Sequence, residues 1–182
     1  MFKMATLNSY NGIMPSLAAG VFIEKSAVLY GDIKVGEDSS IWPLVVARGD
    51  VHRIRIGKRT NIQDACVLHV SRPSLILPGG LPLHIGDDVT VGHKAMLHAC
   101  TIGNRVLIGM GCIILDGAKV ADEVILGAGS LVPPGKKLLS GYLYVGSPAR
   151  QIRELTVQER AFLAESAANY VRLKDEYLAA LP

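Results

Sequence analysis

The sequence predicts a mainly β protein, built as a solenoid of short stacked strands and completed by one long C-terminal α-helix. Aliphatic residues recur every six positions through most of the chain, a spacing that no helix produces. Glycine is frequent, at 19 of 182 residues, as a fold with many tight turns requires. Residues 156–181 lack glycine and proline and change to helical spacing. These observations distinguish a repeat region from a helix that packs against it.

The six-residue repeat indicates one short strand and one tight turn per unit, with one aliphatic side chain pointing inward. A unit of this size is not stable alone, so stacked units must bury a continuous aliphatic column. Strands of an ordinary sandwich usually recur at about 8–12 residues, which makes a sandwich the weaker interpretation. The repeat positions are Ile23, Leu29, Val35, Ile41, Ile56, Ile62, Leu68, Ile85, Val91, Leu97, Ile102, Ile108, Ile114, Val120, Leu126 and Val132.

The repeat also sets the expected segments of the chain. Residues 1–22 precede the repeat and are expected to cap the first coil, and residues 23–150 form the solenoid. Prolines and glycines at residues 71–82 interrupt the repeat and indicate a loop.

The C-terminal segment has the start signal of a helix. Thr156 and Glu159 have the spacing of a capping box, so we expect a helix over residues 156–181 that packs on the solenoid. Its inward stripe is predicted to contain Phe162, Ser166, Tyr170, Leu173 and Tyr177.

Composition argues against several classes of protein. The net charge is +3 and no dense block of Lys and Arg occurs, so a nucleic-acid partner is not expected. No apolar run reaches the roughly 18 residues of a membrane span. The chain has three cysteines and no secretory signal pattern, which predicts reduced thiols and a cytoplasmic location.

The repeat predicts where two of the histidines lie relative to each other. His69 follows Leu68 and His98 follows Leu97, so both occupy the second place of their units. If three units make one coil, the span between them holds one coil and the loop, and the two imidazoles stack on adjacent coils. Parallel strands lie about 4.8 Å apart, a separation at which two imidazoles can share one metal ion.

His93 occupies the third place of its unit and therefore faces another direction. If the coil has three sides, His93 could complete the site from a neighbouring chain in a threefold assembly. Three histidines with an open fourth position are typical of catalytic zinc. The alternative is that His69 and His98 stack without function, as polar surface residues.

Several short motifs occur in order along the chain: Arg48-Gly49-Asp50, Asn61-Ile62-Gln63-Asp64, Val67-Leu68-His69, Val91-Gly92-His93, Leu97-His98-Ala99-Cys100 and Gly146-Ser147-Pro148-Ala149. Together they resemble the gamma-class carbonic anhydrase family, especially its short bacterial branch within the hexapeptide-repeat proteins. The resemblance covers nearly the whole chain. It implies a left-handed parallel β-helix of hexapeptide repeats that assembles as a homotrimer.

The resemblance also implies a chemistry. In this family a metal-bound hydroxide at the trimer interface converts CO₂ reversibly to bicarbonate. The metal-binding histidines of the family match His69, His93 and His98, with His93 supplied by a neighbouring subunit. Zn²⁺ is the expected cofactor, and Fe²⁺ and Co²⁺ are alternatives.

Further site residues follow from the same resemblance. Gln63 matches a glutamine that hydrogen-bonds the metal-bound water, and Tyr170 matches a tyrosine of the C-terminal helix that approaches the site. Arg48 and Asp50 match an ion pair near the subunit interface, with Asp64 alongside; as turn residues they would instead have a local role.

The chain departs from strongly active members of the family in two places. Val51 stands where those members have an acidic residue, and the loop at 71–82 contains no Asp or Glu to export protons. His52 or His84 could replace that group. Low activity, or another substrate, is therefore part of the expectation.

Three other interpretations remain open at this stage. Hexapeptide acyltransferases use a histidine as general base without a metal, and a hydrolase of CoA thioesters could use the same metal site. A non-catalytic metal-binding or assembly protein is the third. Cys66 and Cys100 occupy small inward positions, where we expect them to act as compact hydrophobic residues.

Overall fold

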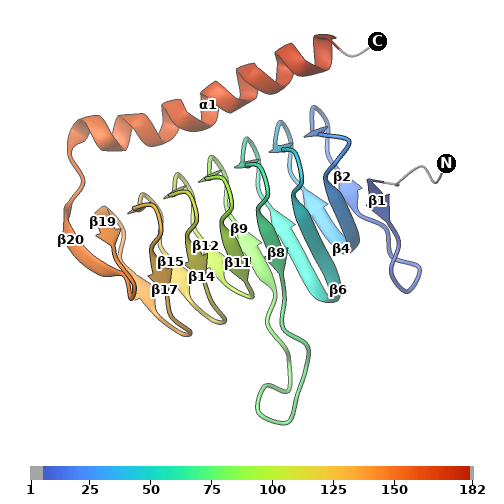
Figure 1. Ribbon diagram of the computed structural model, residues 1–182, viewed down its shortest axis with the longest axis horizontal. Coiled ribbons are helices and arrows are strands. Elements are labelled where there is room, and N and C mark those ends of the chain that lie inside the picture. The colour runs from blue at the N-terminus through green and yellow to red at the C-terminus, as the bar shows by residue number, and fades with distance from the viewer. Residues whose placement is uncertain (1–5, 181–182) are drawn as a thin grey trace.

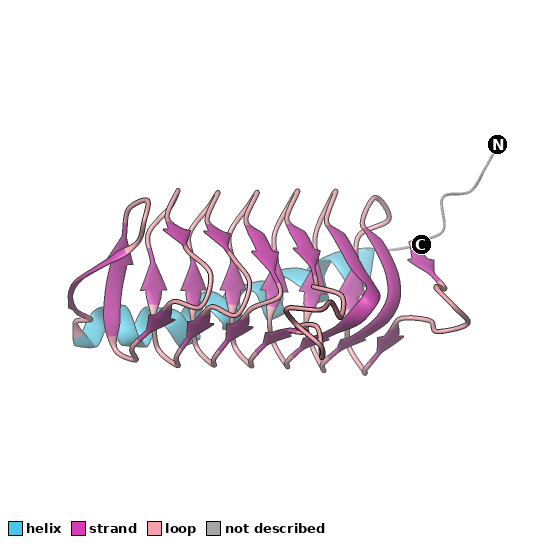
Figure 2. Ribbon diagram, turned by 90° about the horizontal axis from the view of Figure 1, so that it is seen from below, coloured by secondary structure: helices cyan, strands magenta, loops and turns pink. Residues whose placement is uncertain are grey.

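The computed structural model describes residues 6–180 as a parallel β-helix with one long helix along its side (Figure 1). Figure 2 shows the successive coils from below, with the helix running behind them. The predicted mainly β solenoid with a C-terminal helix is confirmed. Residues 1–5 of the expected N-terminal segment and Leu181 of the expected helix lie outside the described residues.

One side of the solenoid, here called the first side, is an eight-stranded sheet. Its short parallel strands stack one coil above the next, and β20 adds an antiparallel strand at the C-terminal end. Its strands are β3 (Phe22–Ile23), β5 (Ser40–Ile41), β7 (Asn61–Ile62), β10 (Thr90–Val91), β13 (Leu107–Ile108), β16 (Ile125–Leu126), β19 (Tyr142–Val145) and β20 (Arg150–Glu154).

The other two sides belong to one twelve-stranded sheet that continues around a corner. The second side contains β8 (Val67–His69), β11 (Met96–His98), β14 (Ile113–Ile114) and β17 (Leu131–Val132). The third side contains β9 (Leu83–Ile85), β12 (Thr101–Ile102), β15 (Lys119–Val120) and β18 (Lys137–Leu138). The longer strands β4 (Val28–Val35) and β6 (Val46–Ile56) join the two sides, and β1 (Leu7–Asn8) and β2 (Ser16–Leu17) pair with β4.

The aliphatic repeat forms the core, as its spacing predicts. Every repeat position named above is buried except Ile23, which is partly exposed. Equivalent residues of successive coils are paired in register; Leu68 lies opposite Leu97, and Leu97 lies opposite Ile114. Burial of each such side chain contributes about 1.5–3 kcal/mol, and the contribution depends on the neighbouring coil.

The helix α1 (Val157–Ala180) begins at the predicted capping box. The backbone N–H of Glu159 donates to Thr156 Oγ1 at 3.1 Å, and the backbone N–H of Thr156 donates to Glu159 Oε2 at 2.9 Å. Two of the orphan donors at the helix start are thus satisfied. Within residues 6–180, no helix combines the length and apolar character that a bilayer crossing needs.

The face that α1 buries is only partly the predicted one. Ser166 is buried and shares a 2.9 Å hydrogen bond with Thr90, but Phe162 and Tyr177 are half exposed. Tyr177 still packs its ring against Phe22 and Trp42, with centroids 5.6 and 5.2 Å away, whereas the prediction was wrong for Phe162, which lies along the α1 groove and leaves half its surface in water. The fully buried positions of α1 are Leu163, Ser166, Ala167 and Lys174.

Candidate metal centre

The two stacked histidines lie together, as the repeat arithmetic predicts. His69 ends β8, His98 ends β11, and the two residues are direct register partners on the second side. Their ring centroids are 5.1 Å apart, and His69 Nδ1 lies 3.1 Å from His98 Nε2. Both side chains are only partly exposed. We call His69 and His98 the histidine pair.

The outer nitrogen of each ring of the pair faces a carboxylate. His69 Nε2 lies 3.1 Å from Asp50 Oδ1, and His98 Nδ1 lies 2.6 Å from Asp116 Oδ1. Burial, followed by the charge of Arg48, lowers the pKa of His69, so this ring is neutral at neutral pH. A carboxylate on the outer nitrogen fixes the tautomer and directs the other nitrogen toward a ligand.

The histidine pair makes more close nitrogen contacts than it has ring protons to form hydrogen bonds in them. A histidine that binds a metal is neutral and carries one ring proton, so two such rings supply two protons, whereas the row Asp50–His69–His98–Asp116 contains three close contacts. If each ring donates its one N–H to its own carboxylate, the two nitrogens that face each other both present a lone pair. A shared cation between them removes this conflict.

The distances fit a metal ion in that place. Two imidazole nitrogens at about 2.0–2.1 Å from a tetrahedral ion lie about 3.3 Å apart, and the facing nitrogens of the pair are 3.1 Å apart. One chain, however, supplies only these two. Across the described part of the chain, no group of three or more His, Cys, Asp or Glu side chains is arranged to hold a metal ion.

His93 lies at the opposite edge of the second side. It follows β10 at the corner between the first and second sides, whereas the pair lies at the corner where β8 and β11 end. Its Nδ1 lies 2.8 Å from Asp64 Oδ2, and its side chain is 42% exposed. Each of the three histidines therefore has its own carboxylate partner.

Gln63 and Tyr170 are on the His93 edge and not with the pair. Together with His93 they line a groove of about 340 Å³ between the first side and α1. Gln63 is buried, and its Nε2 donates to Asn61 Oδ1 at 3.1 Å. Tyr170 packs edge-on against Trp42, and burial raises its pKa. We call this cavity the α1 groove.

Asp50 connects the pair to Arg48. The Arg48 guanidinium donates to Asp50, which also accepts a 2.8 Å hydrogen bond from the Val51 backbone N–H. Partial burial opposes ionisation of Asp50, but the hydrogen bonds from Val51 and His69, with the charge of Arg48, hold its pKa below the usual value. Asp50 is therefore a stable anion beside His69.

The sequence did not predict two polar residues next to the histidine pair, Asp116 and Ser71. The Ser71 hydroxyl donates to the Asp116 carboxylate, which is already bonded to His98. Burial opposes ionisation of Asp116, yet the hydrogen bonds from Ser71 and His98 keep its pKa below the usual value. Asp116 follows His98 by 18 residues, which is one coil, so the repeat arithmetic contained a signal for it.

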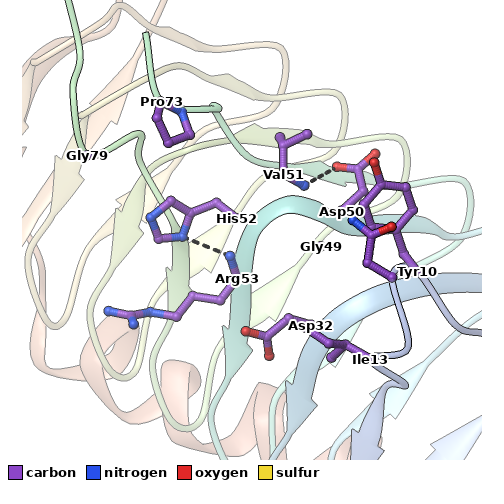
Figure 3. A pocket seen from close by; sticks show the side chains of 11 residues that line it. Tyr10, Ile13, Asp32, Gly49, Asp50, Val51, His52, Arg53, Pro73 and Gly79 are labelled. Atoms are coloured by element: carbon purple, nitrogen blue, oxygen red, sulfur yellow. Dashed lines mark hydrogen bonds between the residues drawn. The ribbon is translucent and has the colours of Figure 1, made fainter.

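The two other histidines occupy different surroundings. His84 lies on the third side, in register with Arg55 and Thr101. His52 lines a pocket of about 350 Å³ that also contains Asp50, Val51 and Pro73. In Figure 3 its ring points away from the Asp50 carboxylate, and its Nδ1 accepts a 2.8 Å hydrogen bond from the Arg53 backbone N–H.

The three cysteines are free and buried, as expected for Cys66 and Cys100. Burial raises the pKa of Cys66 and of Cys100 to about 12, so neither is a thiolate at neutral pH. They pack in the core and are not ligands.

Comparison with known proteins shows which family of proteins this chain is similar to. Residues 99–134 match the bacterial transferase hexapeptide family (six repeats). "Protein YrdA" of Escherichia coli K12 is 59% identical over 94% of each chain. A protein named "Carbonic anhydrase" from Geobacillus kaustophilus is 44% identical over 94% of this chain and 90% of its own length.

A plant protein and a solved bacterial structure are also similar to this chain. "Gamma carbonic anhydrase 2, mitochondrial" of Arabidopsis thaliana is 42% identical over 87% of this chain, which spans 57% of that longer protein. The crystal structure of a "putative acetyltransferase" from Bacillus cereus is 43% identical, covers 96% of this chain and 98% of its own, and superposes with a TM-score of 0.89.

Proposed function

Because the chain belongs to the gamma-class carbonic anhydrase family, we propose that it hydrates CO₂ reversibly at a metal site shared between subunits of a homotrimer. The histidine pair of one subunit and His93 of the next would be the ligands. The observation that carries the proposal is the separation of the predicted site residues into two groups at opposite edges of one side of the solenoid.

The second side has the composition of a subunit interface. Its outward positions form a continuous apolar row along the coils, paired in register from one strand to the next. Two exposed valines and an exposed methionine in this row are unfavourable in water and are typical of a buried contact. The row consists of Val46, Val67, Met96, Ile113 and Leu131.

A threefold ring brings the two edges together. If the second side of each subunit faces the symmetry axis, the edge with the histidine pair meets the His93 edge of the next subunit. Such a contact is heterologous, since different surfaces meet, and three copies close it. Each junction then holds three histidines, three carboxylates and Gln63.

A divalent ion such as Zn²⁺, when bound, would supply Lewis acidity and lower the pKa of water to about 7, so that a hydroxide nucleophile is available for CO₂ at neutral pH. The residues of this chain have the positioning tasks. Asp50, Asp64 and Asp116 would hold the rings of the three histidines in the tautomer that directs a lone pair inward.

Gln63 would orient the nucleophile from the same edge as His93. Its side-chain amide is held by Asn61, which in turn donates to Thr90 Oγ1 at 3.0 Å, so the amide is fixed before substrate arrives. A fixed hydrogen-bond partner lowers the cost of reorganisation in the transition state. Tyr170 would line the substrate side of the α1 groove.

Replacement of His93 by Ala tests the proposal. We expect the variant to lose bound metal, and to lose CO₂ hydration measured by stopped flow, while light scattering reports a weakened trimer. Thr101→Ala, on the third side, is the matched control and should retain all three properties. A His93→Ala protein that keeps its metal would contradict the shared site.

A CoA-ester assay separates this function from the competing enzyme class. Wild-type protein with bound metal should hydrate CO₂ and should neither hydrolyse acetyl-CoA nor transfer its acetyl group. Efficient turnover of acetyl-CoA, with no hydration above background, would instead favour the acetyltransferase that the Bacillus cereus protein is named for.

A further inference from the structure

The loop at residues 71–82 is a short ordered hairpin with an apolar tip. Ser71 and Leu81 exchange both backbone hydrogen bonds, at 3.0 and 2.9 Å. Ser74 and Leu77 exchange another pair, at 2.9 and 3.2 Å, which closes a tight turn. The two central residues of this turn are Leu75 and Ile76, and both are fully exposed. Turns normally place Gly, Asn, Asp or Pro there.

The base of the hairpin is fixed to the histidine pair. The Ser71 hydroxyl donates to Asp116, and Asp116 is bonded to His98. Figure 1 shows the hairpin projecting from the solenoid on the side opposite α1. The tip therefore cannot fold back onto the helix of its own chain, and it extends outward from the edge that would meet another subunit.

The α1 groove offers a matching apolar surface on the other edge. It is lined by Leu107, Met110 and Phe162 beside the candidate site residues His93 and Gln63. Met110 is 60% exposed and Phe162 is 51% exposed, so this groove leaves large apolar side chains in water. Exposed apolar surface of this kind marks a contact site.

From these observations we propose that the hairpin tip of one subunit docks in the α1 groove of the next and covers the shared site. This inference rests on the proposed trimer. In the threefold ring the hairpin leaves its own subunit at the junction and passes over the first side of its neighbour, where α1 lies. The extended segment from Ser71 to Ser74 spans about 10 Å, comparable to the roughly 10 Å between packed layers, and the turn at residues 74–77 adds to this reach.

Disulfide trapping tests the contact. In the variant Ile76→Cys/Phe162→Cys, mild oxidation should produce covalent dimers and trimers on a non-reducing gel, and nothing larger. A bond within one chain is excluded because the hairpin and α1 lie on opposite sides of the solenoid. The native cysteines are buried and do not compete. Leu75→Cys/Met110→Cys is a second pair at exposed positions.

The control variant is Ile76→Cys/Lys119→Cys, which places the second thiol on the third side. It should give no covalent product under the same oxidation. Equal cross-linking in the control, or a ladder that extends beyond trimers, would overturn the docking.

Light scattering on the same samples separates the hairpin docking from the proposed trimer. A trimer that forms no covalent product with either cysteine pair would refute the docking and leave the proposed function intact. A monomer would refute both.

Discussion

At the scale of single residues, the central feature is that each candidate ligand is paired with a carboxylate. Asp50, Asp64 and Asp116 face the outer nitrogens of His69, His93 and His98. The sequence predicted the histidine stacking because a fixed repeat converts sequence separation into position. The same arithmetic places Asp116 one coil after His98, but it was not singled out because an aspartate in a turn usually has only a local role.

Removal of Asp116 should weaken metal binding without unfolding the protein. Outer-shell partners of this type typically change metal affinity by about 10–100-fold. We expect Asp116→Ala to raise the dissociation constant for Co²⁺ by that factor, measured by its absorption spectrum. Asp116→Asn retains an acceptor for the His98 Nδ1–H and should restore much of the affinity. Unchanged affinity in Asp116→Ala would show that the contact has no positioning role.

The core thiols should be inert in the native protein. With a pKa of about 12, Cys66 and Cys100 are ionised to only about one part in 10⁴ at pH 8. Ellman's reagent should therefore detect almost no reactive thiol until denaturant is added, and then all three cysteines. Rapid reaction of either residue in the native state would mean that the coils open readily.

At the scale of elements, the strands were predictable and the helix contact only in part. The hexad specifies which strand residue points inward, and the structure buries those residues from Leu29 to Val132. The capping box also specified where α1 starts. The buried face of α1 depends on the surface of the first side, and the sequence of the helix does not contain that information. Lys174, buried and paired with Asp38 and Asp175, is the clearest example.

The cap of α1 should respond to acid in a defined range. The Arg153 guanidinium, followed by the Thr156 backbone N–H, lowers the pKa of Glu159 to about 2 from 4.5. A depressed carboxyl pKa contributes stability that is complete above about pH 4.5 and is lost as the pH falls toward 2. Carboxyl-detected NMR titration should place the Glu159 midpoint near 2. A midpoint near 4.5 would show that the cap does not form in solution.

At the scale of the whole molecule, the first and second sides of the solenoid have different roles. The first side is covered by α1, and the second carries the apolar row with candidate ligands at both edges. Neither edge holds all three candidate ligands, so the proposed function requires assembly. The sequence suggested assembly through the position of His93 in its repeat, but it could not reveal the hairpin contact, which depends on how two copies meet.

A charge in the apolar row should break the assembly and leave the fold. We expect Met96→Asp to shift the mass measured by light scattering from trimer toward monomer, with an unchanged circular dichroism spectrum and with loss of metal. Thr101→Asp, on the third side of the same coil, is the matched control and should remain trimeric. A trimeric Met96→Asp protein would place the interface elsewhere.

The most direct test of the shared site is complementation between two defective chains. His93→Ala lacks the ligand of one edge, His98→Ala lacks a ligand of the other, and each alone should bind almost no metal. Co-expressed in equal amounts, they should recover metal in roughly a quarter of the junctions, because that fraction joins an intact pair to an intact His93. Mixed trimers with no recovered metal would contradict the account, since a site within one chain cannot be restored by mixing.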